Sequence, residues 1–258
     1  MTTNADILTS RDNGVLRIEI NRAQKRNALT LEMYERLNEA LREAEEQEAV
    51  RVVLFCGQPD VFTAGNDLED FLARPPVDEQ SPTWRFLRAV SRATKPLVAA
   101  VNGSAVGIGV TLLLHCDLVY AGDNARFRLP FTSLGLVPEF ASSYLLPMIA
   151  GYQRAAELLL LAEPFGPEKA LQAGFVTRVV PAAETLAIAE QAAAKLAALP
   201  AKSVQVTKAL LKGAHRALIE TQLQAEAVHW RAMLGEPAAR EAFAAFMEKR
   251  PPDFSQMR

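Results

Sequence analysis

Two short, uninterrupted apolar runs constrain the fold of this chain most strongly. They occupy residues 52–55 (VVLF) and 97–101 (LVAAV), and they end at Gly57 and at Asn102-Gly103. A strand that is apolar at every position is covered on both faces, as in parallel sheets flanked by helices. Similar runs occur at 117–121 and 175–180, and helical patterns such as 84–94 lie between them. The sequence therefore predicts an α/β fold.

The ends of the chain add a hairpin and a helical region. Residues 7–10 and 15–20 are predicted as strands joined by the turn Asp12-Asn13-Gly14, and an amphipathic helix is expected after Thr30, a good N-cap. The proline-containing segment 73–83 lacks periodicity and is expected to be a mobile surface loop. Beyond Pro200 nearly every residue favours helix. We expect a core at 1–199 and a helical region at 200–258, which packs on the core or on a neighbouring subunit.

Composition excludes several classes of function. The formal net charge of -2 provides no basic excess for nucleic acid or an anionic membrane, and no apolar run is long enough to span a bilayer. Cys56 and Cys116 have no metal-ligand spacing and are expected to be buried free thiols, and His115 is expected to be a core histidine. With no targeting signal at its start, the protein is expected in the cytoplasm.

Two glycine-containing segments follow the two apolar strands. The first is FTAGNDL at 62–68, and the second is NGSAVGIGVT at 102–111, which leads into the apolar residues 112–115. Backbone N–H groups at such turns and at a helix start lack partners and can hold an oxyanion. Tight turns are the alternative interpretation. The third glycine of a dinucleotide fingerprint is absent, because position 112 is Leu112.

These two segments resemble the signature regions of the crotonase (enoyl-CoA hydratase/isomerase) superfamily. The resemblance continues in order through residues 116–122 (CDLVYAG), 170–176 (ALQAGFV) and 246–250 (FMEKR), and it starts at 21–29. It implies a crotonase-like spiral of ββα repeats with a C-terminal helical region. It also implies an acyl-CoA thioester substrate and a homotrimer or dimer of trimers.

The resemblance assigns roles to particular residues. The backbone N–H groups of Ala64 and Ile108 are expected to form an oxyanion hole for the thioester carbonyl. Contacts to the substrate and its coenzyme A portion are expected at Lys25, Ala28, Gly65, Asn66, Asp67 and Leu68. Some of these assignments have a structural alternative. Asp67 is equally suited to cap a helix or form a turn, and Lys25 and Arg26 are equally suited to a solvent-exposed basic loop. No separate cofactor is implied, because coenzyme A is part of the substrate, and no metal site is expected.

One carboxylate distinguishes between the reactions of this superfamily. Hydratases activate a water with two glutamates, and the matching positions here are Thr111 and Phe131, neither of which can act as a general base. Glu139 lies nearby. One interpretation is that it has only a structural role, as an acidic residue at a helix N-terminus. The sequence around it (TSLGLVPEFASSY, 132–144) resembles the Δ3,Δ2-enoyl-CoA isomerase branch, in which this glutamate is the catalytic base.

The resemblance therefore implies an enzyme that moves the double bond of a 3-enoyl-CoA to the 2-trans position in fatty acid β-oxidation. Leu136, Val137 and Phe140 are expected to form an apolar wall that raises the pKa of Glu139. Phe243 and Phe246 are expected in the core rather than against ligand. The alternatives are hydration, thioester hydrolysis or decarboxylation on the same fold, and a non-catalytic acyl-CoA-binding protein.

Overall fold

A sheet of six strands forms the centre of the computed structural model, which describes residues 6–75, 78–255 and 257. Its order is β1-β2-β3-β5-β7-β9. The strands are β1 (Ile7–Asp12), β2 (Val15–Ile20), β3 (Val52–Cys56), β5 (Leu97–Val101), β7 (Leu118–Gly122) and β9 (Arg178–Val180). β1 and β2 form the expected antiparallel hairpin, and the other neighbours pair in parallel.

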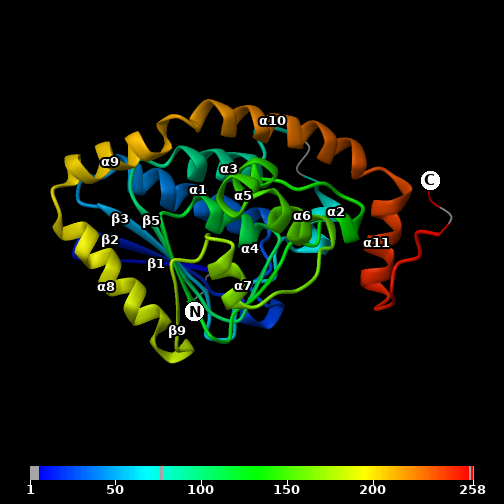
Figure 1. Ribbon diagram of the computed structural model, residues 1–258, viewed down its shortest axis with the longest axis horizontal. Coiled ribbons are helices and arrows are strands. Elements are labelled where there is room, and N and C mark those ends of the chain that lie inside the picture. Colours follow the sequence, from blue (N-terminus) through cyan, green and yellow to red (C-terminus); the bar gives the residue numbers. More distant parts are fainter. Residues whose placement is uncertain (1–5, 76–77, 256, 258) are drawn as a thin grey trace.

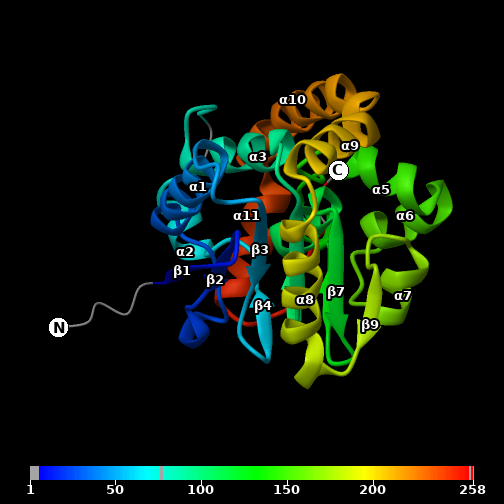
Figure 2. The same cartoon turned by 90° about the vertical axis from the view of Figure 1, so that its left-hand side faces the viewer.

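Helices cover both faces of this sheet. Val52 and Leu54 pack toward Ala189 and Ala193 of α8 (Thr185–Ala198), which crosses one face of the sheet (Figure 2). Val53 belongs to the main core on the other face, together with buried residues of α1 (Leu31–Glu46) and α3 (Pro82–Arg92). The uninterrupted apolar runs are thus explained, because successive side chains of a strand point into two different apolar layers.

A second sheet contains three short parallel strands in the order β4-β6-β8. They are β4 (Val61–Thr63), β6 (Ser104–Val106) and β8 (Arg126–Arg128), and each follows a strand of the large sheet. Gly103 makes one of these crossings possible, because its φ is +62° and a Cβ there would lie 1.8 Å from Asp60 O. The alternation of a long strand, a short strand and a helical turn confirms the predicted α/β architecture.

Shorter helices join these units. They are η1 (Ala23–Lys25), α2 (Leu68–Ala73), α4 (Ile108–Thr111), η2 (Leu112–His115), η3 (Thr132–Leu134), α5 (Ser142–Ala150), α6 (Tyr152–Leu160), α7 (Pro167–Gln172) and η4 (Ala182–Glu184). β9 is shorter than the strand predicted at 175–180, because Phe175 and Val176 pack into the core before pairing with β7 begins. Of the expected loop at 73–83, Arg74, Pro75 and residues 78–81 lie outside helices, and residues 76–77 are outside the described part.

The C-terminal region contains three helices, α9 (Ala201–Gly213), α10 (Arg216–Met233) and α11 (Pro237–Met247). The first two run across the top of Figure 1, and α11 descends at its right-hand side. Trp230 and Phe243 share an apolar cluster with Phe71 of α2, so α10 and α11 pack on the core of their own chain. A role in oligomerisation stays a prediction. Within the described ranges no helix is long and apolar enough to cross a membrane.

Candidate active site

A cavity of about 510 Å³ opens between the two glycine turns and the C-terminal helices. Its walls include every site residue predicted from the sequence: Lys25, Ala28, Ala64, Gly65, Asn66, Asp67, Leu68, Ile108 and Glu139. Trp230, Phe243 and Phe246 close it from the side of α10 and α11. Segments far apart in the chain therefore meet at one site.

The first glycine turn differs from the expectation in which N–H group it leaves free. Ala64 N donates to Arg26 O at 3.0 Å, so its hydrogen is already used and the assignment of Ala64 as an oxyanion donor is wrong for this geometry. Asn66 N makes no hydrogen bond with any described residue, although Asn66 lines the cavity. Asn66, two residues further along, is therefore the available donor of this turn.

Local hydrogen bonds hold Asn66 in place. Gly65 adopts a φ of +93°, and the backbone of Leu29 brackets the turn, donating to Gly65 O and accepting from Asp67 N at 2.8 Å each. Tyr34, buried on α1, donates its hydroxyl to Asn66 Oδ1 at 2.6 Å. Hydrogen bonds from Leu29 thus fix the backbone on both sides of Asn66, and Tyr34 fixes its side chain. The N–H of Asn66 itself has no partner among the described residues.

The second glycine turn retains the predicted donor. Gly107 has a φ of +55° and donates to Arg128 O at 2.9 Å, while Val110 N and Thr111 N both return to Gly107 O. Ile108 N, at the first position of α4, has no partner among the described residues and borders the cavity. The first N–H groups of a helix have no carbonyl acceptor within that helix. Ile108 and Asn66 thus each bring an N–H group without a partner among the described residues to the wall of the same cavity.

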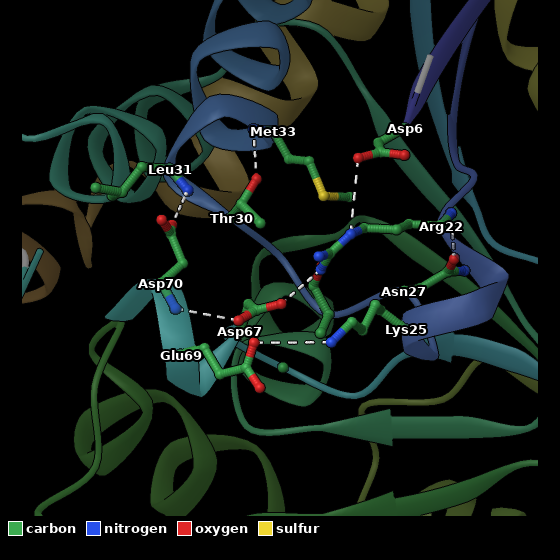
Figure 3. A network of polar contacts seen from close by, with 12 residues as sticks. Asp6, Arg22, Lys25, Asn27, Thr30, Leu31, Met33, Asp67, Glu69 and Asp70 are labelled. Atoms are coloured by element: carbon green, nitrogen blue, oxygen red, sulfur yellow. Dashed lines mark hydrogen bonds and ion pairs between the residues drawn. The ribbon is translucent and has the colours of Figure 1, made fainter. Parts of the chain in front are cut away.

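Both carboxylate oxygens of Asp67 have partners within the protein. Its Oδ1 caps α2 by accepting from Asp70 N at 3.1 Å, and its Oδ2 pairs with Arg22 at 2.6 Å (Figure 3). Burial raises the pKa of Asp67, but the hydrogen bonds from Arg22 and Asp70 outweigh it, so this pKa lies below its usual value. The capping interpretation is confirmed, and Asp67 forms part of the cavity wall as well.

The cavity also has a basic rim. Lys25, Arg26, Arg128 and Arg250 all border it. Lys25 lies 3.7 Å from Glu69 (Figure 3), while the Arg26 side chain donates to the hydroxyl of Ser104 at 3.0 Å. Exposed cations beside an apolar cavity suit the phosphates of a large anionic ligand.

Glu139 places a carboxyl group on the wall of the cavity. Thr111 Oγ1 donates to Glu139 Oε1 at 2.5 Å, and Oε2 has no hydrogen bond to any described residue. The pKa of Glu139 is raised to about 8, chiefly by burial and also by the charge of Glu226, while the Thr111 hydrogen bond lowers it in part. A carboxyl group whose pKa lies near neutrality can both accept and return a proton.

The two hydratase-like positions surround this group without adding an acid. Thr111 is buried and bonded to Glu139, and Phe131 lines the cavity with an apolar ring. The other described acids on the cavity wall are Asp67, which is paired with Arg22, and Glu69 near Lys25. Glu139 is therefore the acid free to meet a ligand.

The apolar wall differs in part from the predicted one. Leu136 lines the cavity, but Val137 does not, and Phe140 is fully buried behind Glu139. Phe243 is buried and also lines the cavity, whereas Phe246 is 60% exposed on its rim, so its placement in the core is wrong. Trp230 of α10 lines the cavity instead, a contact that depends on how this helix packs on the core.

His115 is the satisfied core histidine that was predicted. Its ring stacks on Phe140, and its Nε2 lies 2.8 Å from Phe140 O, which can only accept, so Nε2 carries the hydrogen. Burial lowers the pKa of His115 to about 3, and the ring stays neutral. Cys56 and Cys116 are free, and the described residues contain no His, Cys, Asp and Glu cluster suited to a metal.

Sequence reasoning missed Glu226. It is buried on α10 and accepts hydrogen bonds from the segment that follows Glu139. A signal was present, because Ile219, Leu223, Ala227 and Trp230 mark an apolar helix face and Glu226 lies on it. A lone acid on such a face requires buried partners.

Comparisons with known proteins identify the family. A family model described as Enoyl-CoA hydratase/isomerase matches residues 10–257. Enoyl-CoA delta isomerase 2 of Rattus norvegicus is 33% identical over 95% of this chain and 64% of its own length. The 2,3-dehydroadipyl-CoA hydratase of Escherichia coli (strain K12) is 34% identical over 97% of this chain and 98% of its own. Curated relatives of similar identity thus include both an isomerase and a hydratase.

A solved structure gives the same assignment. The crystal structure of an enoyl-CoA hydratase/isomerase from Pseudoalteromonas atlantica T6c has 41% sequence identity and a TM-score of 0.93, covering 97% of this chain and 100% of its own. The fold is therefore the crotonase fold, with two sheets and a C-terminal helical region. The chain belongs to the enoyl-CoA hydratase/isomerase family of acyl-CoA thioester enzymes.

Proposed function

We propose that this enzyme moves the double bond of a 3-enoyl-CoA to the 2-trans position, with Glu139 as its single base. The observation that carries the proposal is the distribution of acids around the cavity. Glu139 has a free oxygen and a pKa near neutrality, while Thr111 and Phe131 occupy the positions at which a hydratase would need acids. One base suffices for isomerisation, because no water is added.

The reaction requires a site for the thioester oxygen. We assign this site to the N–H groups of Asn66 and Ile108, which have no partners among the described residues and border the same cavity. When a proton leaves the α carbon, negative charge accumulates on the thioester oxygen, and two fixed donors stabilise it. Removal of one such donor costs about a hundredfold or more in rate in other acyl-transfer sites.

The proton then moves along one face of the substrate. Glu139 Oε2 takes the α proton, and the electron pair of that C–H bond passes into a dienolate that extends from the thioester oxygen to the γ carbon. The protonated Glu139 returns the same proton to the γ carbon, which leaves the double bond between the α and β carbons. Atoms and charge balance without a co-reactant.

The surroundings of Glu139 favour this course over hydration. Phe131, Leu136, Trp230 and Phe243 line the cavity beside the carboxyl group. Their apolar side chains limit the access of water to a reactive dienolate. Thr111 holds Oε1, so Oε2 is the oxygen presented to the substrate.

Coenzyme A would lie against the first glycine turn. Lys25, Ala28, Gly65, Asn66, Asp67 and Leu68 form that wall, and Lys25 and Arg26 supply positive charge for the phosphates. As part of the same proposal, the protein acts in fatty acid β-oxidation in the cytoplasm as a homotrimer or dimer of trimers. Size-exclusion chromatography with light scattering measures the assembly directly.

The decisive test uses two substrates. The protein is incubated with 3-enoyl-CoA and, separately, with 2-enoyl-CoA, while conjugated-thioester absorbance and hydroxyacyl-CoA are followed. We expect conversion of the first, no hydration of the second, and loss of conversion in Glu139→Gln. Rapid formation of hydroxyacyl-CoA would assign the enzyme to hydration instead.

A further inference from the structure

The inner face of α10 contacts the segment that carries Glu139. His215, Gln222 and Glu226 lie on this face at helical spacing. Nδ1 of His215 meets the hydroxyl of Tyr144 at 2.8 Å, and Gln222 Nε2 donates to Ser143 Oγ at 2.8 Å. Polar side chains of the C-terminal region thus reach the first turn of α5, directly after the proposed base.

Glu226 makes the strongest of these contacts. It is 4% exposed, and both of its oxygens accept from the α5 start. Ala141 N donates to Oε2 at 2.6 Å, and Ser143 N donates to Oε1 at 2.9 Å. The hydroxyl of Ser143 donates to the same Oε1. Only a carboxylate can accept all of these bonds, because an amide would place an NH₂ against one of the N–H donors.

The backbone held by Glu226 is unfavourable on its own. Phe140 and Ala141 have φ values of 63° and 56°, which non-glycine residues rarely adopt. Two such residues in succession persist only when their surroundings fix them. His115 fixes Phe140 O from the core, and Glu226 fixes Ala141 N from α10. The position of the Glu139 carboxyl group depends on this turn, because Phe140 is the next residue.

We propose that Glu226 is a positioning residue that locks the Phe140-Ala141 turn and so aims Glu139 Oε2 at the substrate. This proposal rests on the proposed function, in which Glu139 is the base. Glu226 does not touch the substrate, since it is absent from the cavity wall. The C-terminal region thereby contributes to the catalytic geometry of its own chain as well as to the wall of the cavity.

Burial raises the pKa of Glu226 to about 7, so its charge is present above that pH and adds a second effect that a purely mechanical support would lack. It is one of the causes that raise the pKa of Glu139, after burial. The other titratable groups around the two acids are Tyr34 from α1, His115 from η2, and the Tyr144 and His215 pair from α5 and α10. His115 is neutral, so its charge state does not change in the working range.

The test compares Glu226→Gln with Glu220→Gln. Glu220 lies on the same helix but pairs with Arg92 at the surface, so it controls for the substitution itself. We expect Glu226→Gln to lower kcat for 3-enoyl-CoA at least tenfold with KM changed less than threefold, and to shift the kcat profile to lower pH. A displacement of about 1 Å suffices for losses of this order. Equal kcat and equal pH profiles in the two variants would overturn the proposal.

Two serines give a milder pair of variants in case Glu226→Gln fails to fold. Ser143→Ala removes the hydroxyl bond to Glu226 together with the acceptor of Gln222, and we expect kcat to fall about threefold to tenfold. Ser142→Ala is its control, because the buried Ser142 Oγ has no hydrogen-bond partner. A Ser143→Ala enzyme that matches Ser142→Ala would also contradict the proposal.

Hydrogen exchange separates this proposal from the proposed function. Faster exchange of the Ala141 and Ser143 amides in Glu226→Gln, with wild-type exchange in Glu220→Gln, is expected whatever reaction the enzyme catalyses. Unchanged exchange would show that Glu226 does not hold the turn. The exchange results could be as expected while the wild-type protein fails to isomerise 3-enoyl-CoA. That outcome would refute the proposed function and the role of Glu226 in orienting Glu139 for it, but the conclusion that Glu226 fixes the Phe140-Ala141 turn would remain.

Discussion

Replacing Glu139 by glutamine should stabilise the protein at alkaline pH. Burial raises the pKa of Glu139 from 4.5 to about 8 in the folded protein, while the unfolded chain keeps the ordinary value. A carboxyl group with a raised folded-state pKa contributes stability that is fully present below pH 4.5 and is lost as pH rises toward 8. The glutamine side chain has no proton to lose in this range, so the Glu139→Gln variant avoids this loss.

The structure sets the size of the effect. At about 1.4 kcal/mol for each pH unit, the full difference between pKa values corresponds to about 5 kcal/mol as an upper limit. Glu139 borders a cavity that solvent enters when no substrate fills it, and this solvent stabilises its charged form, so we expect about 2–3 kcal/mol between pH 5 and pH 9.

Urea denaturation of wild type and Glu139→Gln at both pH values measures this difference. The free energy of unfolding of the variant, relative to that of wild type, should be higher at pH 9 than at pH 5 by about 2–3 kcal/mol. Glu220→Gln, at the surface, should show no such trend. A Glu139→Gln difference that is independent of pH would refute the argument that Glu139 is a buried acid with a raised pKa.

Three further substitutions test the site. Thr111→Val removes the hydrogen bond to Glu139 Oε1, so kcat should fall about tenfold and its pH profile should move to higher pH; unchanged kinetics would show that Thr111 does not orient the base. Ile108→Pro removes one proposed oxyanion donor at a helix position that tolerates proline, so steady-state assays should show kcat lowered about a hundredfold, while Ile108→Val retains activity; equal rates would reject this donor. Asp67→Asn weakens the pair with Arg22 and should lower the free energy of unfolding by about 1 kcal/mol at pH 7. The loss should be smaller at pH 3, because the stability contributed by a carboxyl group with a lowered pKa fades below the ordinary value of 3.8; urea denaturation at the two pH values checks this.

Much of the core could be predicted from local patterns. The runs at 52–55 and 97–101 indicate strands covered on both faces because their side chains alternate between two apolar layers, and α8 and the main core provide those layers. Thr30 and Asp67 were recognisable as caps, since a short polar side chain before a helix has few other uses. These features depend on residues close together in the chain.

Features that depend on tertiary packing were beyond the sequence. The hydrogen bond from Ala64 N to Arg26 O joins two segments that are distant in the chain. Because it occupies the N–H of Ala64, Asn66 is the residue of this turn whose N–H can reach a ligand. The inward face of α10 was visible as a pattern, but the partners of Glu226 were not, because they lie on a turn whose positive φ values no local rule predicts for Phe140 and Ala141. Phe246 lies on the cavity rim for the same reason: the docking of α11 decides which of its faces is covered.

The central claim is that Glu139 carries one proton from the α carbon to the γ carbon. It is tested most directly with 3-enoyl-CoA deuterated at the α carbon, converted by the enzyme in ordinary water, with product analysed by mass spectrometry and NMR after the first turnovers. We predict 2-trans-enoyl-CoA that carries deuterium at the γ carbon, and no conversion by Glu139→Gln. A product without deuterium at the γ carbon, hydroxyacyl-CoA as the main product, or wild-type conversion by Glu139→Gln would contradict the account.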